Sequence, residues 1–299
     1  MKLKTLLSRH RSDLALLVGN GINRYGASRG ANSWDELLST LARNHLDPAQ
    51  KAVPSGISLT EFYDVLELAH SRAVDEPSLQ QQFCDLLKSW RPLGQHAYVA
   101  AWAQRNSVPV LTTNFENSLG EAVACSLRRM RSDGFTAFYP WESYYGTDDV
   151  EDPCARFAIW HVNGMQRYSQ SIRLGLSHYM GSVERARSWM HKGSKHLYNA
   201  DDIKQWPGAS TWLQVFLHKP LLIVGLGLSE TEVFLRWLLI ERAKYFKKLP
   251  HRRKPGWYVH VRGERDQGKL LFLNAVGVEP FSAASFDEIY AETTWGTAK

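Results

Sequence analysis

Short apolar runs alternate with longer helical patterns along this chain, and this alternation constrains the fold more than any other feature. The runs are about four to six residues long, which is typical of strands buried on both faces of a sheet. Because parallel strands need helical crossovers between them, we expect an α/β fold with a parallel sheet and helices on both faces. The strands are expected at 14–18, 108–113, 156–161, 172–176, 221–224, 257–261 and 278–281.

Helical patterns fill the long stretch between the first two expected strands. We therefore predict a single domain over residues 1–299, with a helical insertion at about 34–105 that caps the mouth of the ligand crevice. Ser33 with Glu36, and Ser229 with Glu232, have the spacing of helix capping boxes. Helices are expected at 34–44, 59–72, 78–90, 94–104, 118–130, 179–192, 230–247 and 267–276, with an irregular loop over 132–153.

Composition excludes several classes of protein. A hydrophobic fraction of 44% indicates a folded globular chain, and no apolar run approaches the roughly 20 residues that cross a bilayer. Charged residues interrupt the N-terminal apolar stretch, so it does not read as a signal peptide, and we expect a cytoplasmic location without membrane partners. The three cysteines (Cys84, Cys125 and Cys154) form no C-x-x-C pair, which rules out a four-thiolate zinc site within the chain, and we expect no metal.

The net charge of +6 has two interpretations. The basic cluster at 244–254 could bind nucleic acid or another anion. It could equally be a solvated helix end followed by a basic turn. Charge alone does not decide between them.

Two glycine turns follow expected strands. Gly19, Asn20 and Gly21 come directly after the first strand, where glycines allow a tight turn and a close approach of backbone N–H groups to a pyrophosphate. An ordinary glycine turn remains the alternative. Gly225 and Gly227 lie in a similar position after a later strand, and we expect this loop to line the adenosine side of a nucleotide.

Asn114 and His161 come at the ends of two other strands. In an open α/β sheet, side chains at the carboxyl ends of strands project into the ligand crevice. The amide of Asn114 can hydrogen-bond a ribose hydroxyl or hold a water molecule, although capping of the next helix is an alternative role. The imidazole of His161 can take up a proton near neutral pH, although a lone histidine at a strand end can also be structural.

Taken together, these segments resemble the sirtuin superfamily, specifically its bacterial sirtuin-like NAD-hydrolase branch that acts in anti-phage defence. The similar pieces occur in the family's order between residue 14 and about residue 235. They are V-G-N-G-I-N, S-W-D-E-L-L, L-T-T-N-F-E, H-V-N-G, L-G-L-S-H-Y and V-G-L-G-L-S-E-T-E-V. The resemblance implies a Rossmann-like domain that binds NAD without the zinc ribbon of sirtuin deacylases.

The resemblance also implies roles for particular residues. Asn114 and His161 match the family's catalytic asparagine and histidine. The predicted NAD-binding residues are Gly19, Asn20, Gly21, Asn23, Thr113, Glu116, Gly225, Gly227 and Ser229. The chain departs from the family pattern where Glu116 replaces an aspartate and Gly227 replaces a serine, and Asn20 replaces the small residue typical of the deacylases.

The resemblance predicts cleavage of the nicotinamide–ribose bond of NAD, in an effector that depletes NAD. An unrestrained enzyme of this kind would be toxic, so we expect activation by a protein, by a nucleic-acid-bound complex or by homo-oligomerisation. Two alternatives stay open: an NAD-dependent protein deacylase, and a non-catalytic nucleotide-binding module.

Overall fold

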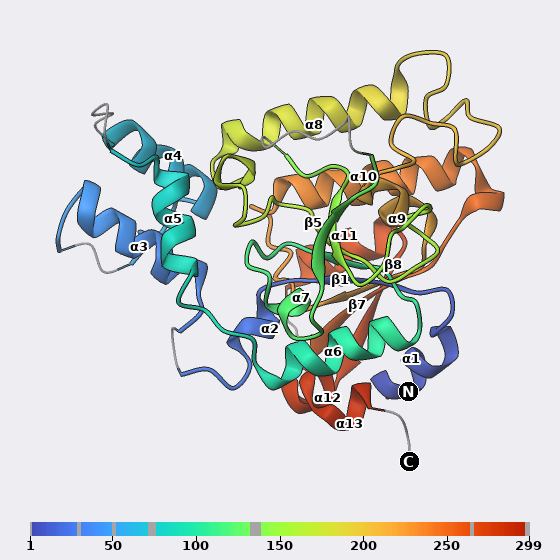
Figure 1. Ribbon diagram of the computed structural model, residues 1–299, viewed down its shortest axis with the longest axis horizontal. Helices are drawn as coiled ribbons and strands as arrows, with labels where there is room; N and C mark the ends of the chain where they lie inside the picture. Colours follow the sequence, from blue (N-terminus) through green and yellow to red (C-terminus); the bar gives the residue numbers. More distant parts are fainter. Residues whose placement is uncertain are drawn as a thin grey trace.

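The protein is described by a computed structural model that covers residues 2–28, 31–49, 52–70, 76–131, 139–263 and 266–296. Its centre is one eight-stranded sheet in the order β3-β4-β5-β2-β1-β6-β7-β8 (Figure 1). The strands are β1 Ala15–Val18, β2 Val110–Thr112, β3 Ser126–Arg129, β4 Ser143–Gly146, β5 Ile159–His161, β6 Leu221–Val224, β7 Gly256–Val261 and β8 Val278–Ala283.

The topology of the sheet is that of a Rossmann-like fold. Strands β5, β2, β1, β6, β7 and β8 pair in parallel, and β3 and β4 add an antiparallel edge. Counted along the chain, the parallel strands have the order 3-2-1-4-5-6, which is the Rossmann order. The order reverses between β1 and β6, so the carboxyl ends of these strands and their neighbours face the crevice where such folds bind ligands.

Alternating side chains of the central strands enter two separate cores, as expected for strands buried on both faces. In β1, Leu17 packs in one core, whereas Leu16 and Val18 pack in the other. The first core includes α8–α11, and the second includes α1, α6, α12 and α13, so helices cover both faces of the sheet (Figure 1). The bounds are α1 Leu3–His10, α6 Gly94–Arg105, α8 Leu176–His191, α9 Trp212–His218, α10 Val233–Lys248, α11 Gln267–Ala275, α12 Phe286–Tyr290 and α13 Glu292–Trp295.

Three helices form a separate cap at one side of the sheet (Figure 1). They are α3 Trp34–His45, α4 Leu59–Ala69 and α5 Leu79–Leu87, and they share a core of their own. The cap ends earlier than the predicted boundary near residue 105, because α6 packs on the sheet through residues such as Val99 and Trp102. The residue Arg72, where we expected the second cap helix to end, lies outside the described residues.

The predicted helix over 118–130 is wrong. Only a short helix, α7 Ser118–Glu121, forms there, and the chain then becomes strand β3. The chain does not continue as a helix through Ala124, which has a positive φ of 54°, and β3 pairs with β4 across four residue pairs. Cys125 therefore lies before a strand and not on a helix. The expected loop over 132–153 contains β4 and lies partly outside the described residues.

Three further local predictions are wrong. Residues 172–176 form no strand, because Ile172 and Leu174 pack into the cap core and α8 then begins at Leu176. Ser33 hydrogen-bonds Asp35 and makes no capping bond to the helix backbone. Ser229 hydrogen-bonds Thr231, and α10 begins only at Val233. In the part of the chain that the structure describes, no helix combines the length and the apolarity needed to cross a bilayer.

Candidate functional site

The ends of β1, β2 and β5 are joined directly by backbone hydrogen bonds. The N–H of Thr113 donates to the carbonyl of Val18 at 3.1 Å, and the N–H of Val162 donates to the carbonyl of Thr112 at 2.8 Å. In this register, Thr112 lies opposite His161. The segments that follow β2 and β5 therefore leave the sheet side by side, and they bring the two predicted catalytic residues together.

Asn114 and His161 are in contact. Nδ1 of His161 lies 2.7 Å from the backbone carbonyl oxygen of Asn114. Because a carbonyl only accepts, Nδ1 carries the proton, and Nε2 keeps its lone pair. Burial lowers the pKa of His161 to about 4, so the ring is neutral at neutral pH. The geometry thus fixes the tautomer of the imidazole and leaves Nε2 as an acceptor.

Several buried polar atoms at these strand ends have no hydrogen-bond partner within the described residues. They include Nε2 of His161, both amide atoms of Asn114 and of Asn163, and Oε2 of Glu116. All four residues are at most 5% exposed. Each unsatisfied buried polar group costs about 1–3 kcal/mol, and such a concentration in one place is typical of a binding or catalytic site.

A hydrogen-bonded network connects the first glycine turn to this cluster. The amide nitrogen of Asn23 donates to Oε1 of Glu116 and to Oδ1 of Asn20, both at 2.9 Å. Nε2 of His96 lies 2.8 Å from Oδ1 of Asn23. Nδ1 of His96 accepts the N–H of Leu93, so Nε2 is the protonated nitrogen and donates to Asn23. The network holds the amide of Asn23 in one orientation beside Glu116.

Glu116 is the carboxyl group of the cluster. Burial raises its pKa to about 7, and the hydrogen bond from Asn23 offsets only part of that effect. The group therefore titrates near neutral pH, which is typical of carboxyl groups at functional sites.

The two glycine turns contact each other. The N–H of Gly21 donates to the carbonyl of Gly225 at 2.8 Å, and the N–H of Gly19 donates to that of Val224 at 2.9 Å. A Cβ on Gly21 would lie 2.7 Å from Cα of Gly225, so only glycine fits there. In this structure, the N–H groups of Gly19 and Gly21 therefore bond the first turn to the end of β6 and to the second turn. A Cβ on Gly227, by contrast, would meet only open space.

A cavity lies between the cap, α8 and the start of α10. Asn163, two residues after His161, is in its wall, as are Ser229, Arg173 and Glu232. Burial raises the pKa of Glu232. Burial also lowers the pKa of Arg173, whose guanidinium stacks over the ring of Tyr139. The remaining wall is mostly apolar and includes Trp34, Leu38, Phe83, Leu174 and Phe234.

The cavity reaches only part of the predicted site. Of the predicted residues, Ser229 lines it directly, whereas Asn114 and His161 do not. Asn114 and His161 are each 1% exposed and thus covered in this conformation. The predicted residues consequently fall into the strand-end cluster (113, 114, 116, 161), the paired turns (19–23, 225, 227) and the cavity wall (229).

Sequence reasoning missed four residues of this region. Asn163 was visible only as part of H-V-N-G, and His96 lies on a helix that we assigned to the insertion. Arg173 lies in a segment predicted to be a strand, and Glu232 was read as a helix cap. The signal that could have identified Asn163 is a second polar residue, two positions after His161, in the same apolar stretch.

Comparisons with known proteins do not assign the chain to a family. No family model matches the chain, and no curated protein gives a match.

Proposed function

We propose that the protein hydrolyses the nicotinamide–ribose bond of NAD, giving nicotinamide and ADP-ribose. The observation that carries the proposal is the buried Nε2 of His161, which is held in its acceptor form by the carbonyl of Asn114. The topology also supports it, because the cluster lies at the carboxyl ends of strands beside the switch point of a Rossmann-like sheet. The motifs that resemble sirtuin-like NAD hydrolases supply the choice of substrate.

In the proposed reaction, a water molecule attacks C1′ of the ribose, and the bond to the nicotinamide nitrogen breaks. Nicotinamide leaves as a neutral molecule because the electrons of that bond neutralise its ring nitrogen. Nε2 of His161 takes the proton from the attacking water. The free amides of Asn114 and Asn163 hydrogen-bond the ribose hydroxyls or the water.

The cavity is the proposed position for part of the dinucleotide. Arg173 places a cation at its wall, which suits a ligand that carries phosphates. Gly227 and Ser229 belong to the loop proposed for the adenosine side, and Ser229 lines the cavity. NAD is the substrate in this proposal, and no metal takes part in the reaction.

The proposal is tested by following nicotinamide release from NAD by chromatography, with and without candidate activators. We expect His161→Ala to reduce the rate by roughly a hundred- to ten-thousandfold, the usual contribution of a general base. His251→Ala replaces an exposed histidine elsewhere and should leave the rate unchanged. Retained turnover in folded His161→Ala would remove the mechanism, and release of nicotinamide only with an acetylated peptide would indicate a deacylase.

We further propose that the resting protein is restrained. The catalytic candidates are covered in this conformation, so NAD can reach them only after the cap or the neighbouring loops move. A partner protein, a nucleic-acid-bound complex or a second copy of the chain would supply this trigger. If the isolated chain hydrolyses NAD at a rate that no candidate partner changes, the restraint does not exist.

A further inference from the structure

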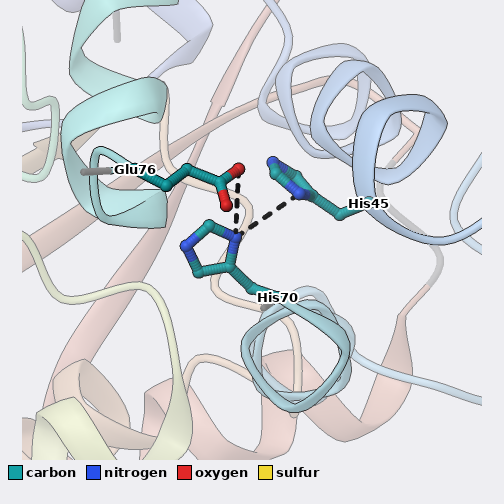
Figure 2. Close-up of side chains that lie close together, drawn as sticks. All are labelled: His45, His70 and Glu76. Atoms are coloured by element: carbon teal, nitrogen blue, oxygen red, sulfur yellow. Dashed lines mark hydrogen bonds and ion pairs between the residues drawn. The ribbon is translucent and has the colours of Figure 1, made fainter. Parts of the chain in front are cut away.

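Two histidines and a glutamate meet in the cap, and none of the three lines the cavity of the candidate site. His45 is the last residue of α3, His70 follows α4, and Glu76 lies shortly before α5. Their side chains point toward one another in Figure 2. One ligand atom from each of the three lies within 4.8 Å of the other two.

The distance between the two histidine nitrogens suits a single small cation, and the carboxylate oxygen lies slightly farther away. Nδ1 of His70 is 3.4 Å from Nδ1 of His45 and 3.8 Å from Oε1 of Glu76. Zinc–nitrogen bonds of about 2.0–2.1 Å with tetrahedral angles place two ligand nitrogens about 3.4 Å apart. The pair of Nδ1 atoms already has that separation.

A second observation fixes the role of His45. Its Nε2 lies 2.8 Å from Oε1 of Gln82, an amide oxygen that only accepts. Nε2 therefore carries the proton, and the lone pair of Nδ1 is directed at His70. Histidines that bind metals usually donate their other N–H in this way, to an oxygen of the surrounding protein.

We propose that His45, His70 and Glu76 bind one Zn²⁺ ion, with Gln82 as the positioning residue for His45. Two imidazole nitrogens and one carboxylate oxygen are a donor set that suits zinc, and a water molecule would complete four-coordination. The ion would join the end of α3, the end of α4 and the approach to α5. Its role is to stabilise the cap, and this proposal does not depend on the proposed enzymatic activity.

The test is a calorimetric titration of the full chain with Zn²⁺ after removal of metals by a chelator. We expect one Zn²⁺ per chain and an increase in Tm, because ions bound only by the folded state stabilise it. Co²⁺ in place of Zn²⁺ should give the visible absorption bands of four-coordinate cobalt. Zn²⁺ binding, the increase in Tm and the cobalt bands should all be absent in His45→Ala.

A milder variant separates the loss of a ligand from the loss of the fold. Glu76→Gln changes a partly exposed side chain and keeps its shape, so the chain should fold while its Zn²⁺ affinity falls at least tenfold. The matched controls Glu184→Gln and His251→Ala alter exposed residues outside the cap and should bind Zn²⁺ as the wild type does. Absence of Zn²⁺ binding by the wild type, or wild-type affinity in folded His45→Ala and Glu76→Gln, would overturn the proposal.

Discussion

The surroundings of His161 fix the tautomer and the protonation state of its imidazole ring. Its protonated nitrogen is held by Asn114, and burial lowers its pKa to about 4. We therefore predict that a rate controlled by this ring stays constant from pH 8 down to about pH 5 and falls only as the pH approaches 4. The measurement is the pH profile of kcat for nicotinamide release in Glu116→Gln, because that variant lacks the second group that titrates nearby. A decline in kcat centred near pH 6.5 would mean that the ring has an ordinary pKa, contrary to this account.

Glu116 should make the stability of the protein depend on pH. Its pKa is raised from 4.5 to about 7 by burial. Between these values the folded state binds more protons than the unfolded state, so this group's contribution to stability falls as the pH rises through 7. We predict that Glu116→Gln is more stable than the wild type at pH 8, by up to about 3 kcal/mol, and equal to it near pH 4.5.

Chemical denaturation of both proteins at several pH values measures this difference. His96 and His161 also titrate with lowered pKa values, but they are present in both proteins and cancel in the comparison. A difference in stability that does not change with pH would show that the carboxyl group is ionised throughout.

The glycine turns contain one glycine that is tightly packed, Gly21, and one that borders open space, Gly227. Gly21→Ala would bring a methyl group against the second turn and the hydroxyl of Tyr290, and we predict a loss of about 1–3 kcal/mol of unfolding free energy. In Gly227→Ala the added methyl group meets open space, so the unfolding free energy of the protein should change by less than about 0.5 kcal/mol. If the second turn holds the nucleotide, Gly227→Ala should instead raise KM for NAD. Thermal unfolding and NAD titration distinguish the two effects.

Phe115 joins the cap to the strand-end cluster. It is 1% exposed. Its ring stacks on Trp34 with 5.0 Å between the ring centroids and meets Phe83 edge-on with 5.6 Å between the centroids. We predict that Phe115→Ala costs about 3–5 kcal/mol and increases hydrogen exchange in α3–α5 more than in α6, which belongs to the other core. The control Phe286→Ala removes an aromatic ring that is 61% exposed and should change neither quantity appreciably.

Elements with a strong local pattern could be predicted from the sequence, whereas those made by long-range pairing could not. The strand at Leu221–Val224 is a continuous apolar run, and it was expected from that run. Strand β3 (Ser-Leu-Arg-Arg) has largely exposed side chains, and its sequence was predicted to be helical. It becomes a strand only because β4 pairs with it. The proximity of Asn114 and His161 was expected from strand ends in a parallel sheet, whereas the bond from the ring to the backbone carbonyl of Asn114 was not. The histidine pair in the cap was not, because it depends on where two helices end.

For the whole molecule, the cap is the element expected to control access to the site. Side chains of the cap tie it to the segment after β5: the N–H of Leu176 donates to Asp64 at 2.9 Å, and Gln80 donates to the carbonyl of Ile172 at 2.9 Å. Leu176 and the nearby Leu174 form part of the cavity wall. Removing the two hydrogen bonds should favour conformations in which the covered groups meet solvent.

We therefore predict that the double variant Asp64→Ala/Gln80→Ala hydrolyses NAD faster than the wild type in the absence of any activator. In this proposal, a closed and an open position of the cap are in equilibrium. Each lost hydrogen bond, worth about 1 kcal/mol, shifts the equilibrium constant several-fold toward the open position. The matched control is Gln81→Ala/Asp85→Ala, which removes the same residue types from a hydrogen bond within α5 and an ion pair from Asp85 to Lys88. Nicotinamide release at equal protein concentration is the measurement, and hydrogen exchange at 112–116 reports whether the cluster became exposed. An exposed cluster without faster hydrolysis would show that covering the site is not what restrains it.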